Sequence, residues 1–204
     1  MIILAKINNI RKLFITAILA ISVTAYSQTL SVPAASPRQM IEQQFSVSKI
    51  TVDYGRPGVK NRTIFGELVP YGKVWRAGAN SSTKITFGQP VNFGGKSVAM
   101  GTYGLFIEPT ANNWKIILNK DSQNWGTVYD SKLDVTSVTV PVQRLNDKQE
   151  YFEISMEPVN DHAVNLVFKW DKVQTSVPVT ADRMDKINRV AEKLQEIKAI
   201  QREK

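Results

Sequence analysis

The sequence predicts an all-β protein, an antiparallel β-sandwich with a C-terminal amphipathic α-helix appended. Three observations support this fold class. Apolar and polar residues alternate along many short segments, which is the period of a half-buried strand. Turn-forming residues separate these segments at the close spacing of a sandwich or barrel. The stretch from Ala181 to Lys204 has no Gly or Pro, and its apolar residues recur at helical spacing. The strand order stays open, and a jelly roll is one topology that the pattern permits.

The N-terminus has the features of a secretion signal. Three basic residues precede an apolar run at residues 13–23, and Ala25 and Ser27 then supply small side chains. We expect cleavage after Ser27, so that residues 1–27 are a signal peptide and the protein is exported to the periplasm or the cell exterior. A spanning helix needs about 20 apolar residues, so no transmembrane anchor is expected after cleavage.

The composition limits the function classes. The chain has 204 residues, no Cys and one His, which excludes thiolate and multi-histidine metal sites, and no cofactor is expected. The signal peptide carries three of the basic residues and no acid, so its removal lowers the formal charge from +8 to +5. This mild basic excess is compatible with an anionic partner, whereas nucleic-acid binding is not expected in an exported protein of modest charge.

Residues 37–180 form a single expected β domain, preceded by a polar leader at residues 28–36. Gly94-Gly95 should make a tight hairpin turn, since both residues tolerate positive φ. The flanks of the turn at residues 109–113 should pair antiparallel. The segments with one apolar face, or with the apolar composition of a strand, are residues 50–54, 83–87, 91–93, 97–100, 103–107, 114–118, 136–142, 152–156, 164–170 and 173–179.

The C-terminal segment at residues 181–204 is the expected helix, with Thr180 as its N-cap. Its apolar stripe could dock on the sandwich, contact another copy or partner, or lie on a membrane surface, and its charges do not choose among these. The stripe consists of Met184, Ile187, Ala191, Leu194 and Ile197.

Residues 55–82 do not show the apolar–polar alternation that is typical of a strand. They are dense in Gly, Pro, basic and aromatic residues, and a long irregular loop in a compact domain is often functional. Three segments of the chain resemble the exported bacterial family called domain of unknown function 2911. They are YGRPGVKNRTIFGELVPYGKVWRAGANSSTKITF (54–87), GTYGLFIEP (101–109) and NWKIILNKDSQNWGTVYD (113–130).

The resemblance covers about Pro37 to Thr180. It implies a secreted protein, and it supplies no activity and no catalytic residues. The positions that match the family pattern are Arg56, Pro57, Lys60, Arg62, Phe65, Gly66, Pro70, Tyr71, Gly72, Trp75, Arg76, Gly78, Ala79 and Asn80.

The same block can be interpreted chemically. Within 21 positions it carries the cations Arg56, Lys60, Arg62 and Arg76. Only Asp53 and Glu67 are nearby acids, so not every cation can be paired locally. Surplus guanidinium beside Tyr71 and Trp75 suits a carboxylate, phosphate or sugar acid, because Arg offers a planar fork of donors and a ring packs on the aromatic face. The alternative is structural: arginines also stack on Trp or bond to loop carbonyls.

A second group follows the segment at residues 114–118, where two aromatic residues on a polar loop could form a stacking platform or could cap the sandwich. If this loop and residues 55–82 share one end of the sandwich, a pocket becomes the stronger interpretation. The candidate ligand-binding residues are therefore Arg56, Lys60, Arg62, Tyr71, Trp75, Arg76, Asn80, Asn119, Trp125 and Tyr129.

Three function hypotheses remain. The first is a non-enzymatic binder of a small or extended polar ligand, a carbohydrate or an anion. The second is a metal-independent hydrolase or lyase acting on carbohydrate. The lone His162 is expected in a turn, and Glu153 and Glu157 on the solvated face of a strand, which does not favour catalysis. The third is a structural or partner-binding envelope protein whose C-terminal helix makes the contact.

Overall fold

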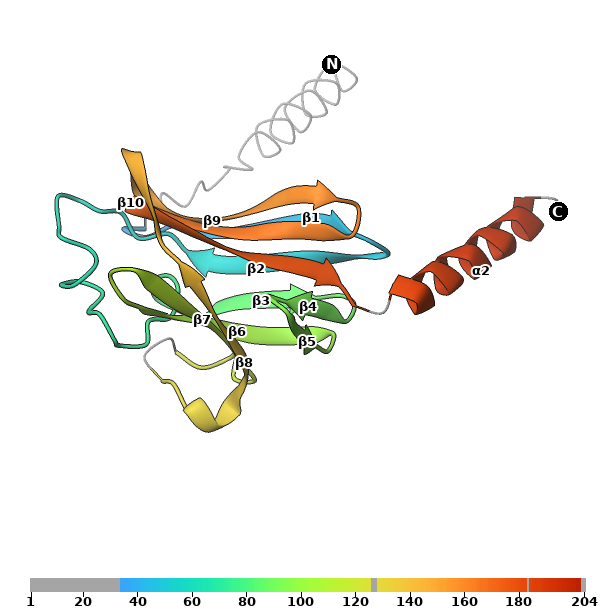
Figure 1. Ribbon diagram of the computed structural model, residues 1–204, viewed down its shortest axis with the longest axis horizontal. Helices are drawn as coiled ribbons and strands as arrows, with labels where there is room; N and C mark the ends of the chain where they lie inside the picture. The colour runs from blue at the N-terminus through green and yellow to red at the C-terminus, as the bar shows by residue number, and fades with distance from the viewer. Residues whose placement is uncertain (1–33, 126–127, 183, 203–204) are drawn as a thin grey trace, which may run out of the picture. The chain divides into compact units, whose positions relative to one another are not determined.

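The computed structural model describes residues 34–125, 128–182 and 184–202, so the expected signal peptide at residues 1–27 lies outside the described part. Ten strands form two antiparallel sheets, and a C-terminal helix follows them (Figure 1). This confirms the predicted fold class. No helix among the described residues is long and apolar enough to cross a membrane.

The larger sheet has six strands in the order β1-β2-β3-β6-β7-β8. β6 and β7 pair antiparallel, as the sequence predicts, with Leu105 opposite Leu118 and Ile107 opposite Ile116. The bounds are β1 Arg38–Phe45, β2 Ser48–Gly55, β3 Thr83–Phe87, β6 Gly101–Pro109, β7 Asn113–Asn119 and β8 Asp134–Pro141.

The smaller sheet has four strands in the order β5-β4-β10-β9. The predicted hairpin is confirmed: Gly94 and Gly95 join β4 to β5 with φ of 55° and 89°, conformations that glycine adopts without steric cost. The bounds are β4 Val91–Phe93, β5 Lys96–Val98, β9 Gln143–Asn160 and β10 Ala163–Ala181.

The core lies between the two sheets. The alternating residues of β2 and β6 meet the alternating residues of β9 and β10, and their side chains form one continuous apolar cluster. Aromatic residues supply its largest members, among them Trp114 on β7 and Trp170 on β10. Because burial of apolar surface is the main favourable contribution to folding, this cluster explains how a chain without disulfides holds two sheets together.

Three strands differ from the sequence expectations. β1 was not expected as a strand, because its inward positions include Gln39 and Gln43 as well as Ile41. The strand predicted at residues 152–156 is the middle of the much longer β9. The two segments predicted at 164–170 and 173–179 are one strand, β10, with an irregularity at Asp171.

The helix α2 spans Met184–Arg202 and ends the described chain. Thr180 is therefore not its N-cap, because β10 continues through Ala181 and Thr180 pairs with Asn92 of β4. The side chains of Met184 and Ile187 lie outside the described residues. Further along the helix, Leu194 and Ile197 are about half exposed.

Candidate ligand-binding site

Two loops meet at one end of the sandwich. The β2–β3 loop (residues 56–82) and the β7–β8 loop (residues 120–130) approach each other through a β-bridge between Ser81 and Trp125. The hydroxyl of Ser82 also donates a hydrogen bond of 2.6 Å to the carbonyl of Asn124. The two loops therefore share one end of the sandwich, and this is the arrangement in which a pocket is the stronger interpretation of the sequence.

The β2–β3 loop is anchored to both sheets. Val59 N–H donates to the carbonyl of Glu150 on β9, and Trp75 exchanges two backbone hydrogen bonds of 2.7 and 2.8 Å with Ile107 on β6. The backbone N–H of Lys60 also donates to the carboxylate of Glu150, which lowers the pKa of that carboxyl group. These contacts fix a long loop that has no strand of its own, which explains how it can hold side chains in defined positions.

Two arginines of this loop have structural partners. Arg62 donates to the carbonyls of Val59 and Gly58, at 3.1 and 2.6 Å. Arg56 donates to the carbonyl of Phe152 at 3.2 Å and lies 4.0 Å from the carboxylate of Glu153. For these two side chains the geometry favours the structural alternative that the sequence left open.

Arg76 differs from both. It is half-buried, and among the described residues it has no hydrogen-bond or ion-pair partner. Its Nε atom is buried without any acceptor. Burial of an unpaired polar group is unfavourable, so such an atom in a native protein calls for an explanation.

Trp75 belongs to the core as much as to the loop. Its ring stacks on Trp170 with centroids 5.4 Å apart and planes 19° apart, and it meets Phe152 edge-on at 4.8 Å. Its indole N–H donates to the carbonyl of Gly78. The ring is thus held rigidly where the loop crosses the sandwich end.

The other candidates of the β2–β3 loop are exposed. Lys60 and Asn80 have positive φ, at 46° and 62°, so both shape turns of the backbone. Tyr71 is 43% exposed and lines neither of the cavities described below. These three residues are not gathered around Arg76.

The β7–β8 loop is organised by a buried amide. Asn119 is 1% exposed; its Nδ2 donates to the Asp130 carbonyl and to the Asp134 carboxylate, and its Oδ1 accepts from the Asp121 N–H. The hydroxyl of Tyr129 donates to the same Asp134 carboxylate at 2.7 Å. Burial and this hydrogen bond raise the pKa of Tyr129 well above its usual value, so the phenol is neutral and unsuited to act as a base.

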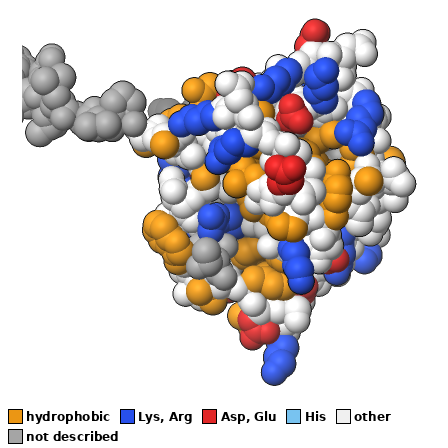
Figure 2. Space-filling model, turned by 90° about the vertical axis from the view of Figure 1, so that its left-hand side faces the viewer, with side chains coloured by type: hydrophobic (Ala, Val, Ile, Leu, Met, Phe, Trp, Pro, Cys, Tyr) orange, Lys and Arg blue, Asp and Glu red, His pale blue; other side chains and the backbone are white. Residues whose placement is uncertain are grey.

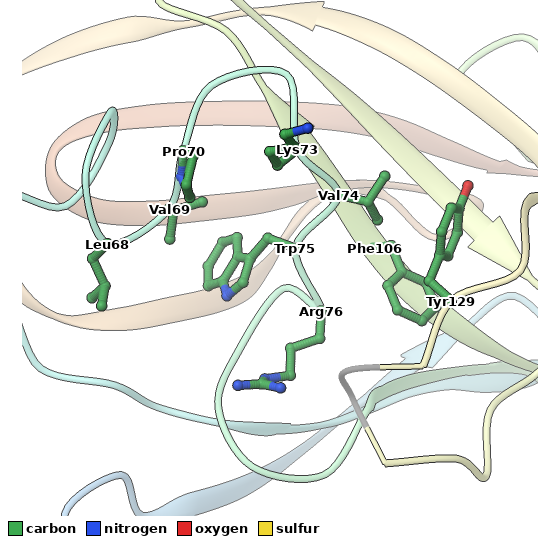
Figure 3. A pocket seen from close by; sticks show the side chains of 9 residues that line it. All are labelled: Leu68, Val69, Pro70, Lys73, Val74, Trp75, Arg76, Phe106 and Tyr129. Atoms are coloured by element: carbon green, nitrogen blue, oxygen red, sulfur yellow. The ribbon is translucent and has the colours of Figure 1, made fainter.

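Two adjoining cavities surround Arg76 and Trp75. The first, of about 310 Å³, lies toward the β7–β8 loop, and we call it the aromatic cavity (Figure 3). The second, of about 230 Å³, lies toward β10, and we call it the arginine cavity. The aromatic cavity is lined by Leu68, Val69, Pro70, Lys73, Val74, Trp75, Arg76, Phe106 and Tyr129. The arginine cavity is lined by Ser36, Pro57, Arg62, Leu68, Val69, Trp75, Arg76, Gly78, Ala79 and Trp170.

The charge of these linings is one-sided. Arg62, Lys73 and Arg76 contribute to them, and no Asp or Glu is among the described residues that line either cavity. Figure 2 shows the side of the molecule on which the β2–β3 loop lies: basic side chains are spread over it, with hydrophobic side chains and some acidic ones exposed between them. A basic, partly apolar lining such as that of the two cavities attracts small anions.

The structure brings only part of the candidate set together. Trp75, Arg76 and Tyr129 line the aromatic cavity, and Arg62 lines the arginine cavity, whereas Trp125 is 61% exposed and lines neither. Arg56 borders a different opening, between β1 and β9. Asn119 lines neither cavity, but its hydrogen bonds hold the β7–β8 loop, which carries Tyr129.

Sequence reasoning missed Phe106 and Trp170. Phe106 lies on the outer face of β6, where it is 2% exposed because the Tyr129 ring covers it at 5.0 Å. The signal that could have found it is the run from Tyr103 to Ile107, which is apolar on both faces and so indicates a covered outer face. Trp170 gave no such signal, since an inward Trp on a strand is typical of any core.

The residues that the sequence offered for catalysis, His162, Glu153 and Glu157, line neither cavity. None of the described residues form a group of three or more His, Asp or Glu that could hold a metal ion. His162 lies in the turn between β9 and β10 and is exposed. Glu157 pairs with Lys169, and Glu153 contacts Arg56, so neither carboxylate faces the other across a cleft.

Comparison with known proteins supports the family resemblance. A family model described as "Protein of unknown function (DUF2911)" matches residues 36–179, which is most of the chain. No curated protein matches the chain, and no solved structure matches it. The extent of the family match shows that this chain belongs to the DUF2911 family.

Proposed function

We propose that the protein is an exported, non-enzymatic binder of a small anionic ligand, which it holds in the aromatic and arginine cavities around Arg76. The observation that carries this proposal is the state of Arg76: it is the one arginine of the β2–β3 loop without a partner among the described residues, and its Nε is buried. A carboxylate-bearing molecule with a ring or short apolar part, such as a sugar acid or an aromatic acid, fits this chemistry.

Three further features support binding of an anion. Arg62 and Lys73 add positive charge, and no carboxylate lines the cavities among the described residues. Trp75, Phe106 and Tyr129 supply aromatic surface for the uncharged part of the ligand. The aromatic cavity, of about 310 Å³, lies at the lower end of the range for small-molecule pockets, about 300–1,000 Å³. Its volume therefore suits a compact molecule.

A thermal-shift assay tests the proposal. The purified protein is heated with acetate, benzoate, galacturonate and phosphate, and with benzyl alcohol and galactose as uncharged counterparts. Ligand that binds only the native state stabilises it by about 2.7 kcal/mol at a hundredfold excess over Kd. We expect a shift with at least one carboxylate and none with its uncharged counterpart.

Two matched variants locate the site. Arg76→Gln should abolish the shift, whereas Arg144→Gln, which removes the same charge from an exposed position on β9, should preserve it. An equal loss in both variants would indicate attraction to overall charge, and no shift with any anion would reject the proposal. Chemical conversion of a bound compound during incubation would instead favour the carbohydrate hydrolase or lyase.

A further inference from the structure

Two residues that carry buried donors without acceptors line the same cavity. Among the described residues, the buried side-chain nitrogens and oxygens that lack a partner are Ser46 Oγ, Arg76 Nε, Gln89 Nε2 and Trp170 Nε1. Arg76 and Trp170 both line the arginine cavity. Because unpaired buried donors are rare in native proteins, their coincidence at one cavity points to an acceptor that binds there.

The Trp170 donor is held in a fixed direction. The residue is 1% exposed on β10, and its ring packs against Trp75, Phe65 and Phe152. Rotation of the indole would disturb all three ring contacts. The N–H group therefore cannot turn toward solvent to find a partner, and its direction is set by the core.

We propose that Trp170 is the second hydrogen-bond donor of the anion site, and that one carboxylate accepts from Arg76 Nε and Trp170 Nε1 together. This inference rests on the proposed function and narrows it to small monocarboxylates. A carboxylate has two oxygens and can accept from two donors at once. Arg62 already binds loop carbonyls, so Arg76 is the arginine of this cavity without a partner among the described residues, and one carboxylate would supply that partner.

The lining of the cavity agrees with this ligand class. Leu68, Val69 and the Trp75 ring provide apolar surface, while Arg62 adds positive charge although its own donors bind loop carbonyls. The volume of about 230 Å³ exceeds the share of one water molecule, about 30 Å³, several times. A compact acid is therefore small enough for this cavity.

Nuclear magnetic resonance of the indole groups tests the inference directly. The four tryptophans give four indole N–H signals, which Trp→Phe variants at positions 75, 114 and 125 assign, leaving the fourth to Trp170. On titration with sodium acetate, we expect a saturable downfield shift of the Trp170 signal and a stationary Trp114 signal. The shift should vanish in Arg76→Gln. A Trp170 signal that stays still, or that moves equally with sodium chloride, would overturn the inference.

Affinity measurements with a matched core variant provide the second test. Trp170→Phe removes the N–H group and should weaken acetate and benzoate binding by about tenfold or more, the value of a hydrogen bond to a charged group. Trp114→Phe removes the same volume from a core position that lines neither cavity and should bind with unchanged affinity.

The outcomes separate the two proposals. If Arg76→Gln abolishes binding while Trp170→Phe leaves it intact, the anion site stands and the role of Trp170 is refuted. If none of the four anions binds in a manner that depends on Arg76, both proposals are refuted. If Trp170→Phe does not fold, the indole titration of the unmodified protein still decides the question.

Discussion

The hydroxyl of Tyr54 hydrogen bonds to both backbone groups of Ile154 across the sandwich. It accepts from the Ile154 N–H at 3.0 Å and shares its proton between the Ile154 carbonyl at 3.2 Å and the Gln39 side-chain oxygen at 3.1 Å. Tyr54 lies on β2 of the larger sheet, and Ile154 lies on β9, an edge strand of the smaller sheet. One phenol thus takes the place of a neighbouring strand and joins the two sheets.

Tyr54→Phe should destabilise the protein by about 1–3 kcal/mol, because it leaves a buried backbone N–H without a partner. Urea denaturation measures the change in the free energy of unfolding. Tyr103→Phe is the matched control, since its hydroxyl makes a single bond, to the Ala99 carbonyl, and should cost about 0.5–1.5 kcal/mol. A loss at Tyr54 no greater than at Tyr103 would contradict the inter-sheet role.

Stability should fall at alkaline pH. Burial raises the pKa of Tyr54, Tyr103 and Tyr129 above the usual value of about 10, and at Tyr129 the hydrogen bond to Asp134 acts in the same direction. Below pH 10 both states keep these protons and the contribution is complete. Above it the unfolded chain releases protons that the folded protein retains, so unfolding becomes easier. Urea denaturation from pH 8 to 11 should show the decline, and Tyr129→Phe should make it shallower; an unchanged slope would refute this assignment.

Arg62→Met and Arg76→Met should have different effects on the free energy of unfolding. Arg62→Met removes donors to two loop carbonyls and should lower the free energy of unfolding by about 1–3 kcal/mol. Arg76→Met removes an unpaired, partly buried cation and should leave stability unchanged or raise it by up to about 1 kcal/mol, as is common when a functional group is removed. Thermal and urea denaturation without added anions make the comparison. Similar losses in both variants would show that Arg76 is structural.

Gly104→Ala should displace the β7–β8 loop. A Cβ at Gly104 would overlap the carbonyl oxygen of Asp121, and backbone cannot move aside as a side chain can. We expect a loss of about 1–3 kcal/mol and weaker anion binding, because Tyr129 is carried by the same loop. Gly58→Ala is the comparison, since its nearest neighbours are side-chain atoms, with Oε1 of Glu150 at 3.3 Å, which need to shift by only a few tenths of an ångström; it should cost less than Gly104→Ala. A Gly104→Ala protein as stable as the parent would show that the loop adapts.

Truncation after Asp182 should leave the sandwich folded. Val190, Leu194, Ile197 and Ile200 of α2 are 54, 49, 51 and 60% exposed, so the part of the helix whose side chains the structure describes adds little buried apolar surface. The unfolding midpoint should match that of the full chain. Light scattering on both proteins reports the oligomeric state. A smaller assembly after truncation would favour a role of α2 in self-contact, whereas a lower midpoint would show that the helix packs on the sandwich.

Local patterns predicted the elements that depend on local physics. The β4–β5 turn follows from Gly94-Gly95, and the β6–β7 pairing follows from alternation on either side of one polar turn. β1 could not be predicted in this way, because an edge strand tolerates Gln39 and Gln43 at inward positions and exposes Met40. The prediction that Thr180 is a helix N-cap was wrong for a related reason. Thr is a suitable N-cap residue, but the pairing of Thr180 with Asn92 of β4 keeps it in the strand β10.

The candidate site was only partly predictable. The sequence identified the excess of cations in residues 55–82, but which arginine lacks a partner depends on carbonyls that residues far along the chain supply, such as Phe152 for Arg56. Phe106 and Trp170 entered the site through packing of separate strands and loops. No spacing in the sequence relates Trp170 to Arg76, since they lie 94 positions apart and meet only at a shared cavity.

The sequence by itself determined the fold class, the family and the segment in which a site would be sought, because periodicity, turn chemistry and a long shared motif are properties of neighbouring residues. The tertiary structure alone decided the strand order, the meeting of the β2–β3 and β7–β8 loops, and the choice of Arg76 over Arg56 and Arg62. Hydrogen-bond satisfaction is the physical reason: whether a buried donor finds an acceptor is settled by the folded surroundings, and an unpaired donor becomes visible only when all of them are in place.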